Sequence, residues 1–386
     1  MKKTLVALAA LASVSAFAQS SVAITGVIDV GFQSNDYKGN KISGINNNGS
    51  ATSTLGFVIN EDLGGGLKAY ASFNSDFNPV STNANRGSAS ALASAQNSTA
   101  GTFLNSQQRA GLTGGFGSIM LGVVNNASLD ANGMGQPFGT AIGSGYGSVI
   151  KTQAGVAAST ASVVRFDNSL RFDTANMNGF TGTVYYAAKQ TASNNTATYS
   201  TTFGANDRAG VQELALKYAQ GPLNAIYARQ QIDYVGVTTP GAVDYNTASA
   251  GVPTAVAGTA LTPKVTLGTL AANYTVGALT VGFTSQSNKD DLATTAVNTK
   301  ANLISAKYVV GPHMFAATTG SLTNGVNSTK STFVGGGYNY ALSKTSKLYL
   351  QTESLADDAV TVAAVTQFTQ VGTKRTRTGM GVVVGF

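Results

Sequence analysis

Apolar and polar residues alternate with a period of two along much of the chain. In the first such segment Val22, Ile24, Ile28, Val30 and Phe32 fall on one face, and Thr25, Asp29 and Gln33 fall on the other. The pattern recurs at residues 67–74, 164–173, 213–218 and 379–386. Such alternation is typical of β-strands with one apolar and one polar face. Segments of about ten residues also suit strands that cross a membrane.

The connections between these segments alternate between tight turns and long polar loops. Turns rich in Gly, Asn and Pro are predicted at residues 62–66, 114–117, 176–179, 220–222, 276–278, 311–313 and 342–345. Long loops are predicted at about residues 34–51, 78–102, 126–162, 191–209, 235–263, 289–300, 322–330 and 355–373. These seven turns and eight loops join sixteen strands. Both ends of the barrel then lie on the short-turn side, as in single-chain outer-membrane barrels.

We therefore predict an all-β fold, a transmembrane antiparallel β-barrel of sixteen strands. Hydrocarbon cannot hydrogen-bond the edge of a sheet, so strands that face lipid must pair all the way round. A barrel of about sixteen strands is wide enough to enclose an aqueous channel. No loop separates two halves of different composition, so the barrel is predicted to be a single domain.

The N-terminus predicts export. Two lysines after Met1 are followed by an apolar run and then by Ala16-Phe17-Ala18. This order matches a signal peptide with an A-x-A cleavage site. We expect residues 1–18 to be removed between Ala18 and Gln19, and residues 19–386 to form the barrel.

The composition agrees with this picture and limits other kinds of site. Only 11% of the residues are charged, and 45 Gly stand against 7 Pro. The net charge is +7, but the basic residues are dispersed, which gives no support for nucleic-acid binding. With no cysteine and only His313, neither a transition-metal site nor another cofactor site is expected.

Catalysis also lacks support. His313 is predicted to lie in a tight turn beside Pro312, with no nucleophile placed next to it. The run Gly64-Gly65-Gly66 lacks a P-loop lysine and is interpreted as a turn. The chain is therefore not expected to be an enzyme.

Several motifs resemble the general trimeric porins of Gram-negative bacteria. They occur in the family's order over nearly the whole mature chain, at residues 21–29, 61–69, 111–122, 168–173 and 338–344 and at the terminal Phe386. The glycine-rich turn at residues 61–69 and the aromatic C-terminus are the most specific of these matches. The resemblance implies a homotrimer of barrels whose third long loop folds inward to narrow the pore.

In this chain the third long loop is residues 126–162. Its turn at Pro137, Phe138 and Gly139 can bend the chain back into a lumen. The family places acidic loop residues opposite a ladder of basic wall residues, but this chain departs from that pattern. Thr54, Val58 and Ser106 occupy wall positions that are usually basic, whereas Arg165 matches. The formal charges noted on the loop are Asp130 and Lys151, so a weakly charged pore is expected.

The alternation assigns the remaining candidate pore residues. Phe166 falls on the apolar face of its segment, and Arg165, Asp167 and Arg171 fall on the polar face. Arg109 is assigned outward, at a subunit interface. The predicted pore and constriction residues are Arg165, Asp130, Arg171, Asp167, Lys151, Arg375 and Arg377.

The expected function is a water-filled channel in the outer membrane of a Gram-negative bacterium, for passive diffusion of small hydrophilic solutes and ions. Lumen-facing basic residues slightly outnumber acidic ones, which predicts weak anion preference. Expected partners are two further copies of the chain, outer-membrane lipid and lipopolysaccharide, and the barrel-assembly machinery, which would recognise Phe386. A substrate-specific channel is the alternative. A surface adhesin is less favoured, because the strands do not recur at one short period.

Overall fold

The computed structural model describes residues 20–37, 40–80, 104–154, 163–188, 208–234, 264–290, 298–324, 330–357 and 374–386. The predicted cleavage site at Ala18 and Gln19 lies outside these residues. In the described part no helix is long and apolar enough to cross a membrane.

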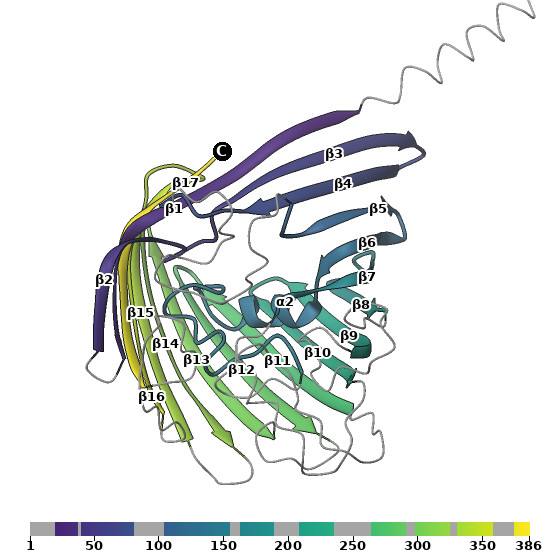
Figure 1. The fold of residues 1–386 in the computed structure, drawn as a ribbon. Helices are drawn as coiled ribbons and strands as arrows, with labels where there is room; N and C mark the ends of the chain where they lie inside the picture. Colours follow the sequence, from purple (N-terminus) through teal and green to yellow (C-terminus); the bar gives the residue numbers. More distant parts are fainter. Residues whose placement is uncertain are drawn as a thin grey trace, which may run out of the picture.

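The described residues form antiparallel strands arranged in a closed ring, with a short helix inside it (Figure 1). The first half of the ring contains β1 (Ser21–Tyr37), β2 (Asn40–Asn47), β3 (Thr54–Gly64), β4 (Leu67–Asp76), β5 (Gln108–Gly114), β6 (Gly117–Asn125), β7 (Arg165–Thr174) and β8 (Phe180–Ala187). The second half contains β9 (Arg208–Gln220), β10 (Leu223–Tyr234), β11 (Lys264–Val276), β12 (Leu279–Asp290), β13 (Thr299–Val310), β14 (His313–Asn324), β15 (Lys330–Ala341), β16 (Lys347–Asp357) and β17 (Arg375–Gly385).

The ring has sixteen positions because β2 and β3 share one of them. Both strands pair with β1: β2 pairs with its second half, Val30 to Tyr37, and β3 with its first half, Ser21 to Val27. The ring closes where β1 pairs with β17 from Val27–Gly385 to Tyr37–Arg375. The predicted sixteen-stranded antiparallel barrel is confirmed.

The short segment between β2 and β3 is held to the inner wall. The Asp29 carboxylate accepts hydrogen bonds from the amides of Ser50 and Ala51 at 2.6 and 2.7 Å, and its other oxygen accepts one from the Tyr349 hydroxyl at 2.8 Å. Asp29 is fully buried, so these bonds replace the water that a carboxylate otherwise requires. Asp29 therefore has a structural role: it holds in place the segment that separates β2 from β3.

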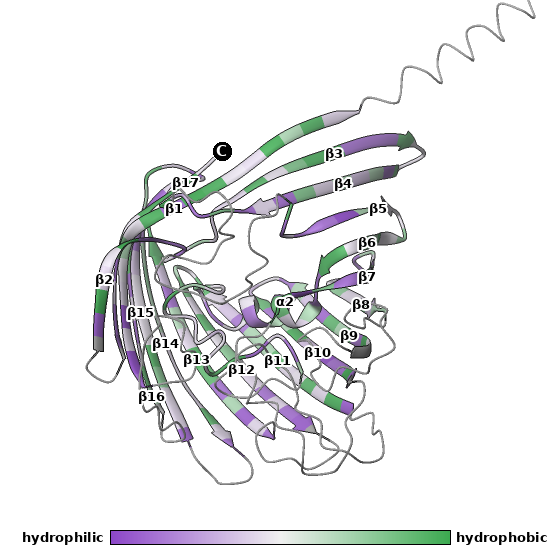
Figure 2. Ribbon diagram, viewed as in Figure 1, coloured by the Kyte–Doolittle hydropathy of each residue, from purple (hydrophilic) through white to green (hydrophobic). Residues whose placement is uncertain are grey.

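The outer surface of the barrel is apolar and the inner surface is polar, as the alternation predicts. On β9 Leu214 and Leu216 are exposed on the outside, whereas Glu213 is buried on the inside. Figure 2 shows the resulting alternation of hydrophobic and hydrophilic colour along the strands. An apolar surface of this kind suits contact with lipid.

One strand departs from the predicted alternation. At β7 two residues, Asp167 and Asn168, lie opposite the single residue Val123, and Asn168 has a positive φ of 53°. This is a β-bulge, and asparagine tolerates the left-handed conformation better than most residues. The extra residue reverses the alternation, so Phe166 turns inward and packs against Tyr185. The prediction that Phe166 faces outward was wrong.

Candidate functional site

The segment after β6 crosses the inside of the barrel and begins with helix α2 (Ala127–Met134). The Glu213 carboxylate on β9 accepts hydrogen bonds from the amides of Ala127 and Ser128, both at 2.8 Å, and from the Ser128 hydroxyl. The Asn126 side chain caps the helix by accepting a hydrogen bond from the Leu129 amide at 2.9 Å. These acceptors satisfy amides that the first turn of a helix leaves without partners. The start of the helix is thereby fixed to the inner wall.

Glycines on the wall allow the next part of this segment to approach closely. A β-carbon at Gly282 would lie 2.5 Å from the Gly135 carbonyl oxygen, and one at Gly335 would overlap the Gly143 carbonyl oxygen. The Ser305 hydroxyl donates to the Gly135 carbonyl at 2.9 Å. Only residues without a side chain fit at such contacts. Residues 135–143 therefore lie in a groove that wall glycines leave on β12 and β15.

The predicted turn at Pro137, Phe138 and Gly139 forms part of this contact. Phe138 is buried, and a β-carbon at Gly337 would lie 2.9 Å from its ring. Gly139 has a positive φ of 62°, and its carbonyl accepts a hydrogen bond from the Asn132 side chain at 3.0 Å. The turn thus anchors the segment against β15.

Wall side chains bind the main chain of the last described part of the segment. Gln286 accepts a hydrogen bond from the Lys151 amide and donates one to the Lys151 carbonyl, both at 2.8 Å. Gln230 accepts one from the Ala154 amide at 2.8 Å. The side-chain amides of these two glutamines hydrogen-bond to the main chain of the segment, much as a neighbouring strand would. Residues 126–154, the inner segment, are therefore held along β9 to β16.

Lys151 itself does not face open space. Its side chain is 1% exposed, and its ammonium donates a hydrogen bond to the Gly147 carbonyl. The expectation that Lys151 supplies a charge to the pore is wrong, because its ammonium is enclosed by the segment that carries it.

Arg375 and Arg377 meet at one buried carboxylate. Glu353 pairs with Arg375 at 2.9 Å and with Arg377 at 2.8 Å. It also accepts a hydrogen bond from the Gly143 amide at 2.8 Å, while Arg375 donates to the Ser148 hydroxyl at 2.6 Å. The side chains of Glu353 and Arg375 are 1% and 3% exposed. This cluster holds the inner segment, and Arg375 is not available to passing ions.

A second charged cluster joins helix α2 to the wall of β7. Arg171 binds Asp130 of the helix at 2.6 Å and Asp173 of its own strand at 3.0 Å. The Asp130 side chain remains 42% exposed. A carboxylate of the segment that crosses the lumen therefore lies against an arginine of the wall.

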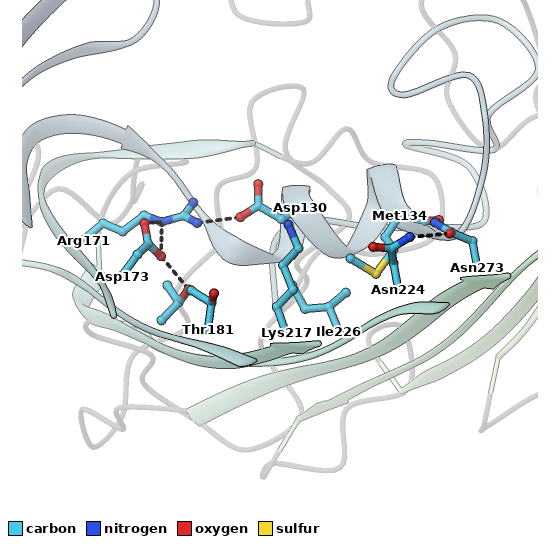
Figure 3. A pocket seen from close by; sticks show the side chains of 10 residues that line it. Asp130, Met134, Arg171, Asp173, Thr181, Lys217, Asn224, Ile226 and Asn273 are labelled. Atoms are coloured by element: carbon cyan, nitrogen blue, oxygen red, sulfur yellow. Dashed lines mark hydrogen bonds and ion pairs between the residues drawn. The ribbon is translucent and has the colours of Figure 1, made fainter. Parts of the chain in front are cut away.

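These residues border a cavity of about 630 Å³ (Figure 3). Figure 3 shows Lys217 beneath the helix with its side chain directed upward, and Asn224 beside Asn273. Lys217 is exposed, and in the described part of the chain no carboxylate lies within ion-pair distance of its ammonium. Lys217 is a pore-lining cation: the alternation of its strand predicts that it faces the lumen, but it was not among the predicted constriction residues.

Arg109 is another lumen-facing cation. On β5 it lies opposite Ser72 and Gly122, and its guanidinium donates to the Ser72 hydroxyl at 3.2 Å. It also lies over the Tyr70 ring, 5.7 Å from the centroid, in cation–π geometry. Its neighbour Ala110 takes the exposed outer position instead. The prediction that Arg109 faces outward at a subunit interface was wrong.

The other predicted site residues lie apart from these clusters. Arg165 pairs with Asp76 at 3.4 Å. Asp167 is exposed at the β7 bulge. Phe386 exchanges two main-chain hydrogen bonds with Gly26, each of 3.0 Å, and so continues the pairing that closes the ring.

Comparison with known proteins gives a consistent result. A family model described as Gram-negative porin matches residues 4–359. An outer membrane porin protein of Bordetella pertussis is 28% identical over 272 residues, which is 65% of each chain. Outer membrane porin protein 32 of Delftia acidovorans is 50% identical over 72 residues, 18% of this chain and 20% of the relative. The matches thus span less than two thirds of the length of these curated relatives.

Among solved structures, the anion-selective porin from Comamonas acidovorans superposes with a TM-score of 0.71. The alignment covers 95% of this chain and 100% of that structure, at 22% identity. OmpT of Vibrio cholerae in its trimer form gives a TM-score of 0.62 at 13% identity, with 95% and 99% covered. At these identities the likeness shows a common barrel fold.

Proposed function

We propose, because this chain belongs to the Gram-negative porin family, that it forms a water-filled channel for passive diffusion of small hydrophilic solutes and ions across the outer membrane. The observation that carries the proposal is the position of residues 126–154 inside a closed barrel. They are fixed to β9–β16 by Glu213, Gln286 and Glu353. The segment then narrows the lumen, and solutes pass between it and the wall formed by β4–β8.

Weak anion preference follows from the charges along that passage. The Arg171 cluster joins one arginine to two carboxylates and the Glu353 cluster joins one carboxylate to two arginines, so their formal net charges of −1 and +1 cancel each other. Arg109 and Lys217 have no carboxylate within ion-pair distance among the described residues. In water two unit charges 4 Å apart interact by only about 1 kcal/mol, and physiological salt screens charges over about 8 Å. Two such cations therefore favour anions without rejecting cations.

A planar lipid bilayer tests the channel directly. The purified protein should give stepwise single-channel currents in KCl. A salt gradient should give a reversal potential on the anion-selective side that grows as the salt is diluted. Absence of current steps would contradict the channel, and strong cation selectivity would contradict the charge assignment.

Solute competition separates a general channel from a substrate-specific one. Sugars, amino acids and small carboxylates of similar size should reduce the ion current to similar extents if diffusion is general. Saturable reduction by one class alone would favour the substrate-specific alternative. No catalytic role is part of the proposal.

The assembly and processing of the chain belong to the same proposal. The chain is cleaved after Ala18, is inserted by the barrel-assembly machinery through Phe386, and functions as a homotrimer in contact with lipopolysaccharide. Intact mass and unboiled gel electrophoresis of the purified outer-membrane protein test the first and third of these statements.

A further inference from the structure

The cavity beneath helix α2 combines charged, amide and apolar side chains. Asp130 and Met134 border it from the helix, and side chains of β7 to β11 border it from the wall (Figure 3). Its volume of about 630 Å³ lies in the range of cavities that hold small molecules. The cavity is therefore large enough to hold a solute beside the inner segment.

The helix above the cavity is fixed at both ends. Glu213 binds its first turn, as described above. At the other end the Asn273 side chain donates a hydrogen bond to the Met134 carbonyl at 2.9 Å and accepts one from the Asn224 side chain at 3.0 Å. The last carbonyls of a helix otherwise lack partners. The cavity is therefore preformed, and a solute need not order its walls on binding.

The charges around the cavity balance in sign. Arg171 and Lys217 are cationic, and Asp130 and Asp173 are acidic, so the lining has no formal net charge. Such a lining gives little advantage to a simple anion or to a simple cation. It is electrostatically complementary to a solute that carries both charges.

Two groups of opposite charge remain available in this lining. Arg171 is engaged by Asp173 at 3.0 Å, by Asp130 at 2.6 Å and by the Asn125 carbonyl at 3.1 Å. Lys217 has no carboxylate within ion-pair distance among the described residues. Asp130 uses only its Oδ2 for Arg171, and its side chain is 42% exposed. An ammonium on the wall and a carboxylate on the helix therefore border one cavity without pairing to each other.

An apolar surface lies next to the free ammonium. Ile226 is the direct cross-strand neighbour of Lys217 on β10, and Met134 lies on the helix above. Methionine is flexible and adapts to apolar groups of different shape. The cavity can therefore hold an apolar side chain beside the group that binds a carboxylate.

We propose that this cavity binds a zwitterionic α-amino acid with an apolar side chain. Lys217 binds the carboxylate, Asp130 binds the ammonium, and Met134 and Ile226 contact the side chain. Both polar contacts are charge-assisted hydrogen bonds, which are stronger than neutral ones. A simple anion or cation satisfies only one of the two groups, whereas a zwitterion satisfies both without adding net charge.

The proposal rests on the proposed function and deepens it. Thr181, Lys217 and Asn224 each lie within the first or last four residues of their strands, next to short turns. Short turns of outer-membrane barrels face the periplasm. The cavity therefore lies towards the periplasmic end, between α2 and the wall, and adds a preference for amino acids to a channel that stays open to other solutes.

The test compares leucine with leucinamide, which lacks the carboxylate, and with N-acetyl-leucine, which lacks the ammonium. Each compound is titrated onto the purified full-length mature protein in detergent, and its binding is measured by ligand-observed NMR. Leucine should bind about tenfold more tightly than either analogue, because each analogue loses one charge-assisted contact.

Two substitutions assign the contacts separately. Lys217→Gln should lose the preference for leucine over leucinamide while binding leucinamide as the wild type does, which shows that the cavity is intact. Lys217→Arg should keep the preference. Asp130→Asn should lose the preference for leucine over N-acetyl-leucine. Lys344→Gln, which removes an exposed lysine from a short turn outside the cavity, should leave all three affinities unchanged.

Equal binding of the three compounds by the wild type would overturn the site, as would an unchanged preference in Lys217→Gln or in Asp130→Asn. Current steps in a planar bilayer test the channel independently of this binding. A preference for leucine without current steps would contradict the proposed function and leave the site standing. Current steps without a preference for leucine would overturn the site and leave the channel standing.

Discussion

The Glu213 carboxylate on β9 accepts hydrogen bonds from the amide and the hydroxyl of Ser128, the amide bond being 2.8 Å long. These residues are far apart in the sequence, yet the bonds join the barrel wall to the first turn of the only helix in the described residues. A carboxylate at a helix N-terminus is also favoured by the helix dipole. The hydrogen bonds between Glu213 and Ser128 therefore fix the point at which the inner segment begins to cross the lumen.

Replacing Glu213 should therefore release the start of α2. In Glu213→Ala the amides of Ala127 and Ser128 lose their acceptor, at a cost of about 1–3 kcal/mol for each buried group left unpaired. We expect larger fluctuations of the open-channel current, measured in a planar bilayer. Gln212→Ala, on the outer face of the same strand, should leave the current noise unchanged. Equal noise in both variants would show that Glu213 does not hold the segment.

Arg109 should contribute to ion selectivity. The substitution Arg109→Gln removes a lumen-facing cation that has no acidic partner among the described residues. The reversal potential should shift towards cation selectivity, and the shift should increase at low salt as screening weakens. Lys344→Gln removes the same charge at the short-turn rim and should cause a smaller shift. Equal shifts would indicate that net charge, and not position, sets the preference.

Gly335 should be required for the seating of the inner segment. A β-carbon there would overlap the Gly143 carbonyl, and overpacking of this kind costs about 1–3 kcal/mol. Gly335→Ala should displace the segment towards the open lumen and lower the single-channel conductance. The adjacent Gly336 offers a control, since its β-carbon would meet the Ala316 carbonyl at an ordinary 3.6 Å. If Gly336→Ala lowers the conductance as much, the close contact is not the cause.

Phe386 should matter for assembly. Its main chain exchanges two hydrogen bonds with Gly26, and its ring occupies the space beside that glycine. Deleting Phe386 should reduce the amount of folded, heat-modifiable protein in the outer membrane, seen on unboiled gels. An unchanged folded fraction would contradict an assembly role for this residue.

The mature protein should begin at Gln19. The motif Ala16-Phe17-Ala18 after an apolar run predicts cleavage there. Intact mass spectrometry of the outer-membrane protein decides the point, and a mass that includes Met1 would contradict it.

The local sequence was sufficient for the architecture. Alternation at residues such as Glu213 and Leu214, and glycine-rich turns such as residues 64–66, determine strands with one lipid-compatible face and their short connections. Hydrocarbon then requires the strands to close. These are properties of neighbouring residues and of the solvent, so they can be predicted without knowing any distant contact.

The identity of the free charges was decided only by the tertiary structure. Lys151 and Arg375 are enclosed by other parts of the chain, and Glu353 pairs with two arginines from another strand. The bulge at Asn168 reverses the direction of Phe166, and the β5 pairings turn Arg109 to the lumen. Each outcome depends on register or on contacts between residues far apart in the chain. A shift of one residue moves a side chain to the other face of the sheet, so alternation alone could not assign the lining of the pore.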